Sequence, residues 1–411
     1  MKSYLPPLYH PTPNRKTHIS NNRTKNIDTT NISSLVSIGA CSKSKEINSQ
    51  SQNSQKLKPL ERSRFYFIDN LRILACFSVI LIHVSSQLMA KFSSNWEVAL
   101  FYNCLGRMGV PLFLVITGYL VFSPESCNKT HSIFSIYRFL KHRYLKLLIP
   151  FFTTCFIYGW YNQWTIETIL HKIVYKQVCY HLWYIYASIG LYLSIPFLRP
   201  LFRKENLNSI KIYLIVWFVF QLLFNTAQIL LGKTIPLIAD FNLNIFFGIT
   251  GYMILGGFFR NINLNTVSIN FDNPNRINTI YVKTSLCISV ILLMTALMWY
   301  LTNFISLRSG RPNESLLYSL TLFYFIKIIA IYFLFSLHNL SSSFIKYLAK
   351  HCYWIYLFHV LAISIISKFF ILNENPTVMI PLVSILSFVY SFILAIPFKI
   401  IEEKLYSIMN I

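Results

Sequence analysis

Apolar stretches of about 20 residues recur along the chain from residue 69 onward, separated by short polar connections. An α-helix of this length is about what is needed to cross the ~30 Å hydrocarbon core of a bilayer. The pattern therefore predicts an all-α, polytopic membrane helix bundle of about ten transmembrane helices. They are expected at residues 69–90, 101–122, 144–163, 181–200, 210–231, 243–259, 281–303, 316–337, 351–372 and 377–398.

Residues 1–64 differ in kind from the rest of the chain. They are rich in Asn, Ser, Lys, Thr and Pro, and they show no hydrophobic periodicity. They also lack the apolar core of a secretory signal peptide. This composition predicts a disordered, basic cytoplasmic tail, because such a segment cannot bury enough apolar surface to fold. The transmembrane domain is expected over residues 65–405.

Composition agrees with a membrane protein: 54% of the residues are hydrophobic and only 12% are charged. Soluble domains usually have about 25% charged residues, so an ordinary cytosolic enzyme is excluded. The net charge of +23 could indicate nucleic-acid binding. Orientation explains it instead, because placing both termini in the cytoplasm gives the inner segments a roughly threefold excess of Lys and Arg. We expect a multi-pass protein of the cell inner (plasma) membrane, with membrane lipid and not nucleic acid as a partner.

The eight cysteines are scattered and never form a Cys-x-x-Cys pair, so neither a disulfide framework nor a zinc site is indicated. No metal site is expected. The glycines Gly118, Gly256 and Gly257 fall inside predicted helices. Because small residues let membrane helices approach closely, we expect these glycines to serve helix packing.

Ionisable side chains within the predicted helices are few, and each is a functional hypothesis because burying charge in a membrane is costly. Carboxylates are almost absent there, and Asp69 stands at the inner mouth of the first helix. The candidates inside helices or near their ends are Arg72, His83, Lys327, His359, Arg107, Arg143, Lys146 and His181. Lys327 matches no motif and is expected to snorkel or to line a pore.

Arg72 and His83 share one face of the first helix. They are eleven positions apart, which at 100° per residue is three turns plus about 20°, with a rise of about 16 Å. A cation then sits at the cytoplasmic mouth, with an imidazole beyond the middle of the bilayer. This arrangement could hold a phosphate at Arg72 and perform proton chemistry at His83. The alternative is a hydrogen-bonded core histidine and a snorkelling arginine.

These residues resemble a known family. Asp69-x-x-Arg72 followed by His83 is similar to the first-helix signature of the integral-membrane acyltransferase 3 family, an Arg or Lys and a His with ten residues between them. Four further segments resemble the family in the same order. Residues 110–120 are similar to its Pro-Leu-Phe-Phe-x-x-Ser-Gly-Tyr stretch, 143–150 to Arg-x-x-Arg-x-x-x-Pro, 181–196 to its His-Leu-Trp helix, and 353–359 to Gly-Ile-Tyr-x-x-His. The likeness covers about residues 66–400.

Within the family, the chain most resembles the enterobacterial common antigen O-acetyltransferases, through residues 68–72 and 180–183. Two positions depart from the family pattern. Lys146 replaces the usual second Arg, which turns a bidentate phosphate contact into a point charge. Trp354 stands where a small residue is common.

The resemblance implies O-acetylation in cell-envelope polysaccharide biosynthesis, with acetyl-CoA as the cytoplasmic acyl donor and no bound cofactor. The acceptor would be a hydroxyl of an envelope glycan or its lipid-linked precursor. His83 would act as base or acyl carrier, since imidazole can do either near neutral pH, and Asp69 joins it as a catalytic candidate. Arg72, Arg143 and Lys146 would bind the CoA phosphates.

Four residues are expected to bind the acceptor or the acetyl carbonyl: Arg107, His181, Trp183 and His359. Each has a plainer interpretation as a cap or a packing residue. Two other functions stay open. One is a transporter or flippase that moves a lipid-linked glycan without acyl transfer, and the other is a membrane scaffold that interacts through the basic tail. Neither requires an Arg and a His on one helix face.

Overall fold

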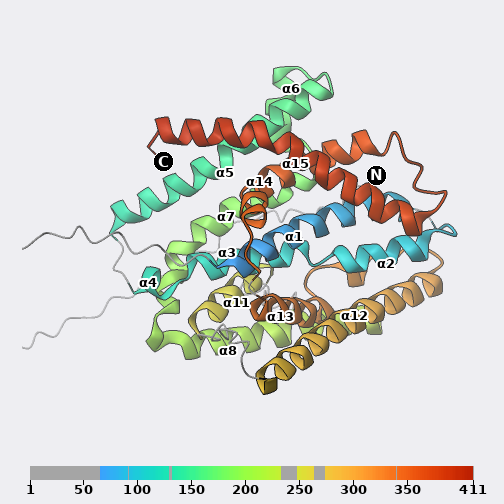
Figure 1. The fold of residues 1–411 in the computed structure, drawn as a ribbon, viewed down its shortest axis with the longest axis horizontal. Coiled ribbons are helices and arrows are strands. Elements are labelled where there is room, and N and C mark those ends of the chain that lie inside the picture. Colours follow the sequence, from blue (N-terminus) through green and yellow to red (C-terminus); the bar gives the residue numbers. More distant parts are fainter. Residues whose placement is uncertain are drawn as a thin grey trace, which may run out of the picture. The chain divides into compact units, whose positions relative to one another are not determined.

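The computed structural model describes residues 65–90, 92–128, 132–232, 248–262, 274–338 and 340–410, without the side chains of 274–277. The predicted tail, residues 1–64, and positions 243–247 of the sixth predicted helix lie outside the described residues. Throughout the described part of the chain the regular elements are helices, with no strand (Figure 1). The prediction of an all-α protein is confirmed.

Eight helical segments in the described residues are long and apolar enough to cross a membrane. They are Tyr66–Leu88, Trp96–Val121, Tyr180–Phe202, Lys204–Leu231, Asn278–Ser309, Ser315–Leu337, Ser343–Ile366 and Pro376–Ile408. The protein is therefore a multi-pass membrane protein. The two other predicted crossings coincide with α5, Ile133–Tyr161, and α11, Thr250–Asn261, which has 12 residues. The number of ten crossings and the cytoplasmic placement of the termini stay predictions.

The remaining helices follow the predicted order, apart from short helices at Pro124–Cys127 and Ile166–Tyr175 that the apolar pattern did not predict. Their bounds are α1 Tyr66–Ser85, α2 Trp96–Gly106, α3 Gly109–Val121, α4 Pro124–Cys127, α6 Ile166–Tyr175, α7 Trp183–Leu198, α8 Leu207–Trp217, α9 Phe224–Leu231, α12 Pro274–Ser309, α13 Leu322–Leu337, α14 Ser343–Ile366 and α15 Pro376–Ile408. A π-helical segment, Phe218–Leu223, connects α8 to α9.

Helix α1 lies in the middle of the membrane domain, drawn in blue in Figure 1, where it contacts α2, α3, α13, α14 and α15. Its sequence is apolar on nearly every face, which suits a helix surrounded by other helices. Its first half belongs to one cluster of buried apolar side chains through Phe67 and Leu71. Its second half belongs to another through Val79 and Ile80. Arg72 and His83 are thus fixed within different packing environments.

The second apolar span is interrupted between α2 and α3 at Arg107 and Met108. Glycines flank this break, and a Cβ atom on Gly106 would lie 2.8 Å from the carbonyl oxygen of Ser78 on α1. At the end of α2, the Lys327 ammonium donates to the carbonyl oxygens of Cys104 at 2.8 Å and Leu105 at 3.3 Å. These carbonyls are among the last four of α2, which have no partner within their own helix. Lys327 is fully buried, so the expectation that it snorkels is wrong.

Two helix contacts explain the roles of Gly118 and Trp354, which the sequence analysis identified. A Cβ atom on Gly118 of α3 would clash with the carbonyl oxygen of Met253 on α11, which confirms that this glycine serves close helix packing. Trp354 of α14 is buried, and its indole nitrogen donates to Glu402 Oε2 of α15 at 2.5 Å. Glu402 is also paired with Lys399 at 3.2 Å. The large residue at position 354 therefore joins α14 to α15.

Candidate active site

Asp69 and Arg72 meet at the first turns of α1. A guanidinium nitrogen of Arg72 donates to Asp69 Oδ1 at 2.9 Å, and the Asp69 side chain is buried while that of Arg72 is about one-third exposed. His83 lies fourteen positions further along the helix, about 21 Å away by the helical rise. The structure thus brings Asp69 to Arg72 and not to His83. In this arrangement the carboxylate orients the guanidinium.

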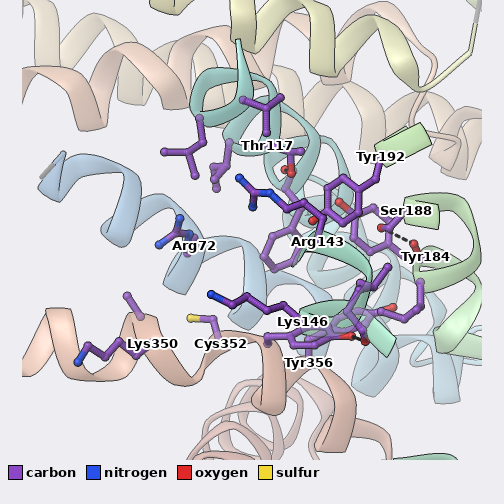
Figure 2. Close-up of a pocket in the computed structure, with 18 residues that line it drawn as sticks. Arg72, Thr117, Arg143, Lys146, Tyr184, Ser188, Tyr192, Lys350, Cys352 and Tyr356 are labelled. Carbon is purple, nitrogen blue, oxygen red and sulfur yellow. Dashed lines mark hydrogen bonds between the residues drawn. The ribbon is translucent and has the colours of Figure 1, made fainter. Parts of the chain in front are cut away.

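Arg72 opens onto a pocket of about 370 Å³ formed between α1, α3, α5, α7 and α14 (Figure 2). This size is within the range of small-molecule binding sites. Arg143 and Lys146 of α5 line the same pocket, as does Lys350 of α14. None of the residues that line it in the described part of the chain is Asp or Glu. The pocket therefore carries a concentrated positive charge, and it unites the three cations that the sequence assigned to phosphate binding.

Lys350 is a member of this cation group that the sequence analysis missed. It precedes His359 by nine positions, at the end of α14 that was expected to face the cytoplasm. Sequence alone could not distinguish Lys350 from the Lys and Arg residues that commonly anchor helix ends on the cytoplasmic side.

The positive charge of the pocket also acts on His142, on the part of α5 before the predicted crossing. Partial burial and then the neighbouring charges of Lys146 and Arg143 lower the pKa of the His142 imidazole.

Three aromatic rings form one wall of this pocket, which we call the cationic pocket. The rings of Phe113, Tyr184 and Tyr356 all line the cationic pocket and pack on one another, with centroid distances of 6.0 to 6.3 Å. Tyr356 has a second role, because its hydroxyl donates to the backbone carbonyl of His181. Its ring also lies 5.6 Å from that of His359. Tyr356 thus links the cationic pocket to a group of histidines.

Three histidines from three helical segments meet beyond that wall. The ring of His83 stacks against that of His359 with centroids 5.1 Å apart, and His181 meets His359 edge-on at 4.7 Å. His181 and His359 are buried, and His83 is partly buried. The sequence predicted a catalytic role for His83 and acceptor or acetyl binding for His181 and His359, on three separate helices. The structure shows that they form one cluster, here named the histidine cluster.

Backbone carbonyls of α14 hold two of these imidazoles. His181 Nε2 lies 3.3 Å from the carbonyl oxygen of Leu357, and His359 Nδ1 lies 2.5 Å from that of Tyr356. Tyr158 of α5 supports the same turn, since its hydroxyl donates to the Leu357 oxygen at 3.3 Å and accepts from the Leu361 amide at 3.0 Å. A side chain inserted in this way locally reshapes a helix. It leaves carbonyl oxygens of α14 accessible to His181.

Arg107 approaches the end of α1 through a polar network. Its Nε donates to Asn103 Oδ1 at 2.7 Å, and Asn103 Nδ2 donates to the hydroxyl of Ser85, two positions after His83, at 3.1 Å. A second guanidinium nitrogen pairs with Glu314 at 3.2 Å, a partner that the sequence did not reveal.

Trp183 is about 40% exposed and packs on Tyr184. These observations do not place the Trp183 ring in the histidine cluster, and its role in acceptor binding stays a prediction.

The histidine cluster does not resemble a metal centre, because the described residues contain no group of three His, Cys, Asp or Glu side chains that could hold a metal ion. What the arrangement offers chemically is a cationic pocket for an anionic group and, on the other side of an aromatic wall, three imidazoles for proton transfer.

Comparison with known families identifies the family to which the protein belongs. The acyltransferase 3 family, whose model describes an acyltransferase domain, matches residues 65–399. Since the match covers most of the chain, the protein belongs to that family, and its apolar helices make it a multi-pass membrane protein. The family prediction made from the motifs is confirmed.

Among curated proteins, an amino-acid racemase of Enterococcus faecalis is 26% identical over 215 residues, which is 51% of this chain and 28% of the racemase. The chain thus spans less than a third of the length of that relative. No solved structure matches the chain.

Proposed function

We propose that the protein transfers an acetyl group from cytoplasmic acetyl-CoA to a hydroxyl of a cell-envelope polysaccharide or its lipid-linked precursor, in the cell inner membrane. The observation that carries this proposal is the connection of two sites through α1 and α14. One site is the cationic pocket, and the other is the histidine cluster. The likeness of residues 68–72 and 180–183 to enterobacterial common antigen O-acetyltransferases supports a glycan as the acceptor.

The cationic pocket suits the donor. Coenzyme A carries phosphates, and Arg side chains bind phosphate oxygens through charge-assisted, often bidentate, hydrogen bonds. Arg72 and Arg143 would take these contacts, with Lys146 and Lys350 as point charges. The thioester would then extend past the aromatic wall toward His83, about 16 Å along α1 from Arg72.

His83 would serve as the general base in the histidine cluster. It takes the proton of the acceptor hydroxyl while the oxygen attacks the thioester carbonyl, so that a C–O bond forms. The C–S bond then breaks, and the leaving thiolate receives the proton from the imidazolium to give free CoA and an acetyl ester. In a second route, the neutral His83 nitrogen attacks the thioester carbonyl, the C–S bond breaks and the CoA thiolate leaves. The acceptor oxygen then attacks the acetyl-imidazole, the C–N bond breaks, and the hydroxyl proton passes to the thiolate to give free CoA and an acetyl ester.

A transporter or flippase is the competing function, and the observed site argues against it. Moving a lipid-linked glycan does not need phosphate-binding cations connected to a cluster of imidazoles. The racemase activity named for the Enterococcus faecalis relative is not proposed here, because the match spans only 28% of that protein.

The test is acetyl transfer by membranes that contain the protein, supplied with acetyl-radiolabelled acetyl-CoA and crude cell-envelope glycan. Wild-type membranes are expected to label the glycan. His83→Gln keeps hydrogen bonding but cannot take a proton at neutral pH, so labelling should fall by about 10²- to 10⁴-fold. His351→Gln, another buried histidine on α14 that bonds the Tyr347 carbonyl, is the control. Labelling by His83→Gln near the wild-type rate would refute the catalytic role of His83.

A further inference from the structure

We propose that His181 and His359 form a binding site for hydroxyl groups of the acyl acceptor, and not for the thioester carbonyl. The inference rests on the proposed acetyl transfer and specifies which substrate each part of the histidine cluster receives. It follows from which nitrogen of each ring carries a hydrogen.

Contacts with α14 fix the hydrogen positions. A carbonyl oxygen can only accept a hydrogen bond, so His359 Nδ1, 2.5 Å from the Tyr356 oxygen, must carry a hydrogen. By the same reasoning His181 Nε2 donates to the Leu357 oxygen. A neutral imidazole has one N–H and one lone pair. The remaining nitrogens, His359 Nε2 and His181 Nδ1, are therefore hydrogen-bond acceptors.

These two nitrogens have no partner in the described part of the chain although both rings are at least 98% buried. A buried polar atom without a hydrogen bond is costly, and in a native protein it indicates a role that needs the free atom. Two neighbouring tyrosine hydroxyls are directed at backbone carbonyls instead. Tyr356 donates to the His181 carbonyl, and Tyr158 donates to the Leu357 carbonyl.

Two free acceptor nitrogens on neighbouring rings select a ligand that donates. The ring centroids of His181 and His359 lie 4.7 Å apart, and His83 stacks on His359. A thioester carbonyl offers only lone pairs, so it would face the two nitrogens without forming a hydrogen bond. A sugar offers several O–H donors on adjacent carbons. Such a ligand would satisfy both nitrogens and place a hydroxyl beside His83.

The sharpest variant is His359→Phe, which keeps a ring of similar size and removes both nitrogens, the free acceptor Nε2 and the Nδ1 that bonds to the Tyr356 carbonyl. The apparent KM for crude cell-envelope glycan should rise by about tenfold or more, while the KM for acetyl-CoA should stay within about twofold of wild type. His359→Gln can present its amide oxygen and should recover part of the glycan affinity. His351→Phe is the matched control, because this buried histidine makes the same kind of bond to its own helix.

Each result decides the question. An unchanged glycan KM in folded His359→Phe, or a rise in the acetyl-CoA KM instead, would overturn the inference. So would failure of His359→Phe to elute as a monodisperse protein while His351→Phe does, because a ligand-binding nitrogen is not needed for folding. Absence of glycan labelling by the wild-type protein would instead refute the proposed function itself.

Discussion

Replacement of Lys327 by Met tests whether the break between α2 and α3 depends on a buried ammonium. Met has nearly the same length as Lys and keeps the apolar contacts of the side chain. The substitution leaves two carbonyl oxygens, those of Cys104 and Leu105, without the donor that they have in the native protein. It also removes a positive charge from the C-terminal end of a helix dipole, where such a charge is favourable.

The magnitude follows from the two lost hydrogen bonds. A buried acceptor left unsatisfied costs about 1–3 kcal/mol, so two cost about 2–6 kcal/mol. The folded wild type, however, bears the cost of keeping an ammonium out of water, and the variant does not. We expect a net destabilisation of about 2–4 kcal/mol, large beside the 5–15 kcal/mol stability of typical proteins.

The assay is the unfolding midpoint of the detergent-solubilised protein, measured for Lys327→Met and for the control Lys283→Met. Lys283 is exposed on α12, so its replacement should change stability by less than about 0.5 kcal/mol. If Lys327→Met unfolds at the same midpoint as this control, the carbonyls have other partners and the reasoning on the helix break is wrong.

Three further outcomes are expected. Arg72→Lys keeps the charge but loses the planar fork, so initial-rate kinetics should show the KM for acetyl-CoA raised by about fivefold or more; an unchanged KM would make Arg72 a topology anchor. Lys350→Gln should also raise that KM, by about 3- to 10-fold through the loss of one phosphate contact, whereas Lys283→Gln should not. Gly118→Leu should abolish folded protein because the side chain would enter α11, while Gly190→Leu, with open space around its Cβ position, should yield monodisperse protein. Equal yields would contradict the α3–α11 contact.

The fold was predictable as far as it depends on the length of apolar runs. Eight of the predicted crossings appear as long apolar helices because a membrane span needs little more than length and hydropathy. The break at Arg107 and Met108 was not predicted, although Gly106 and Gly109, which favour a break, flank it in the sequence. The partner of the exposed α2 carbonyls was not predictable, because Lys327 reaches α2 from more than 200 positions away.

The site was predictable from the sequence where its residues lie on a single helix. The placement of Arg72 and His83 on one face needs only the helical period, and the phosphate-binding set was grouped through its motifs. The meeting of His83 with His181 and His359 depends instead on how α1, the 3₁₀ turn Tyr180–Leu182 before α7, and α14 come together. No spacing in the sequence encodes that arrangement. The pairing of Asp69 with Arg72 was predictable from the i, i+3 spacing of the two residues. The sequence analysis instead predicted a catalytic role for Asp69 together with His83.

Helix α14 and not α1 sets the geometry of the two sites. α1 carries Arg72 and His83, but the imidazole partners of His83 are oriented by the carbonyls of Tyr356 and Leu357. The Tyr356 ring lines the cationic pocket, while its hydroxyl holds the backbone of His181. A small shift of this turn would therefore move the pocket wall and both acceptor nitrogens together. Because one turn of backbone positions the wall of the cationic pocket and the histidine cluster at once, the proposed donor and acceptor can be held in a fixed relation by rigid packing alone.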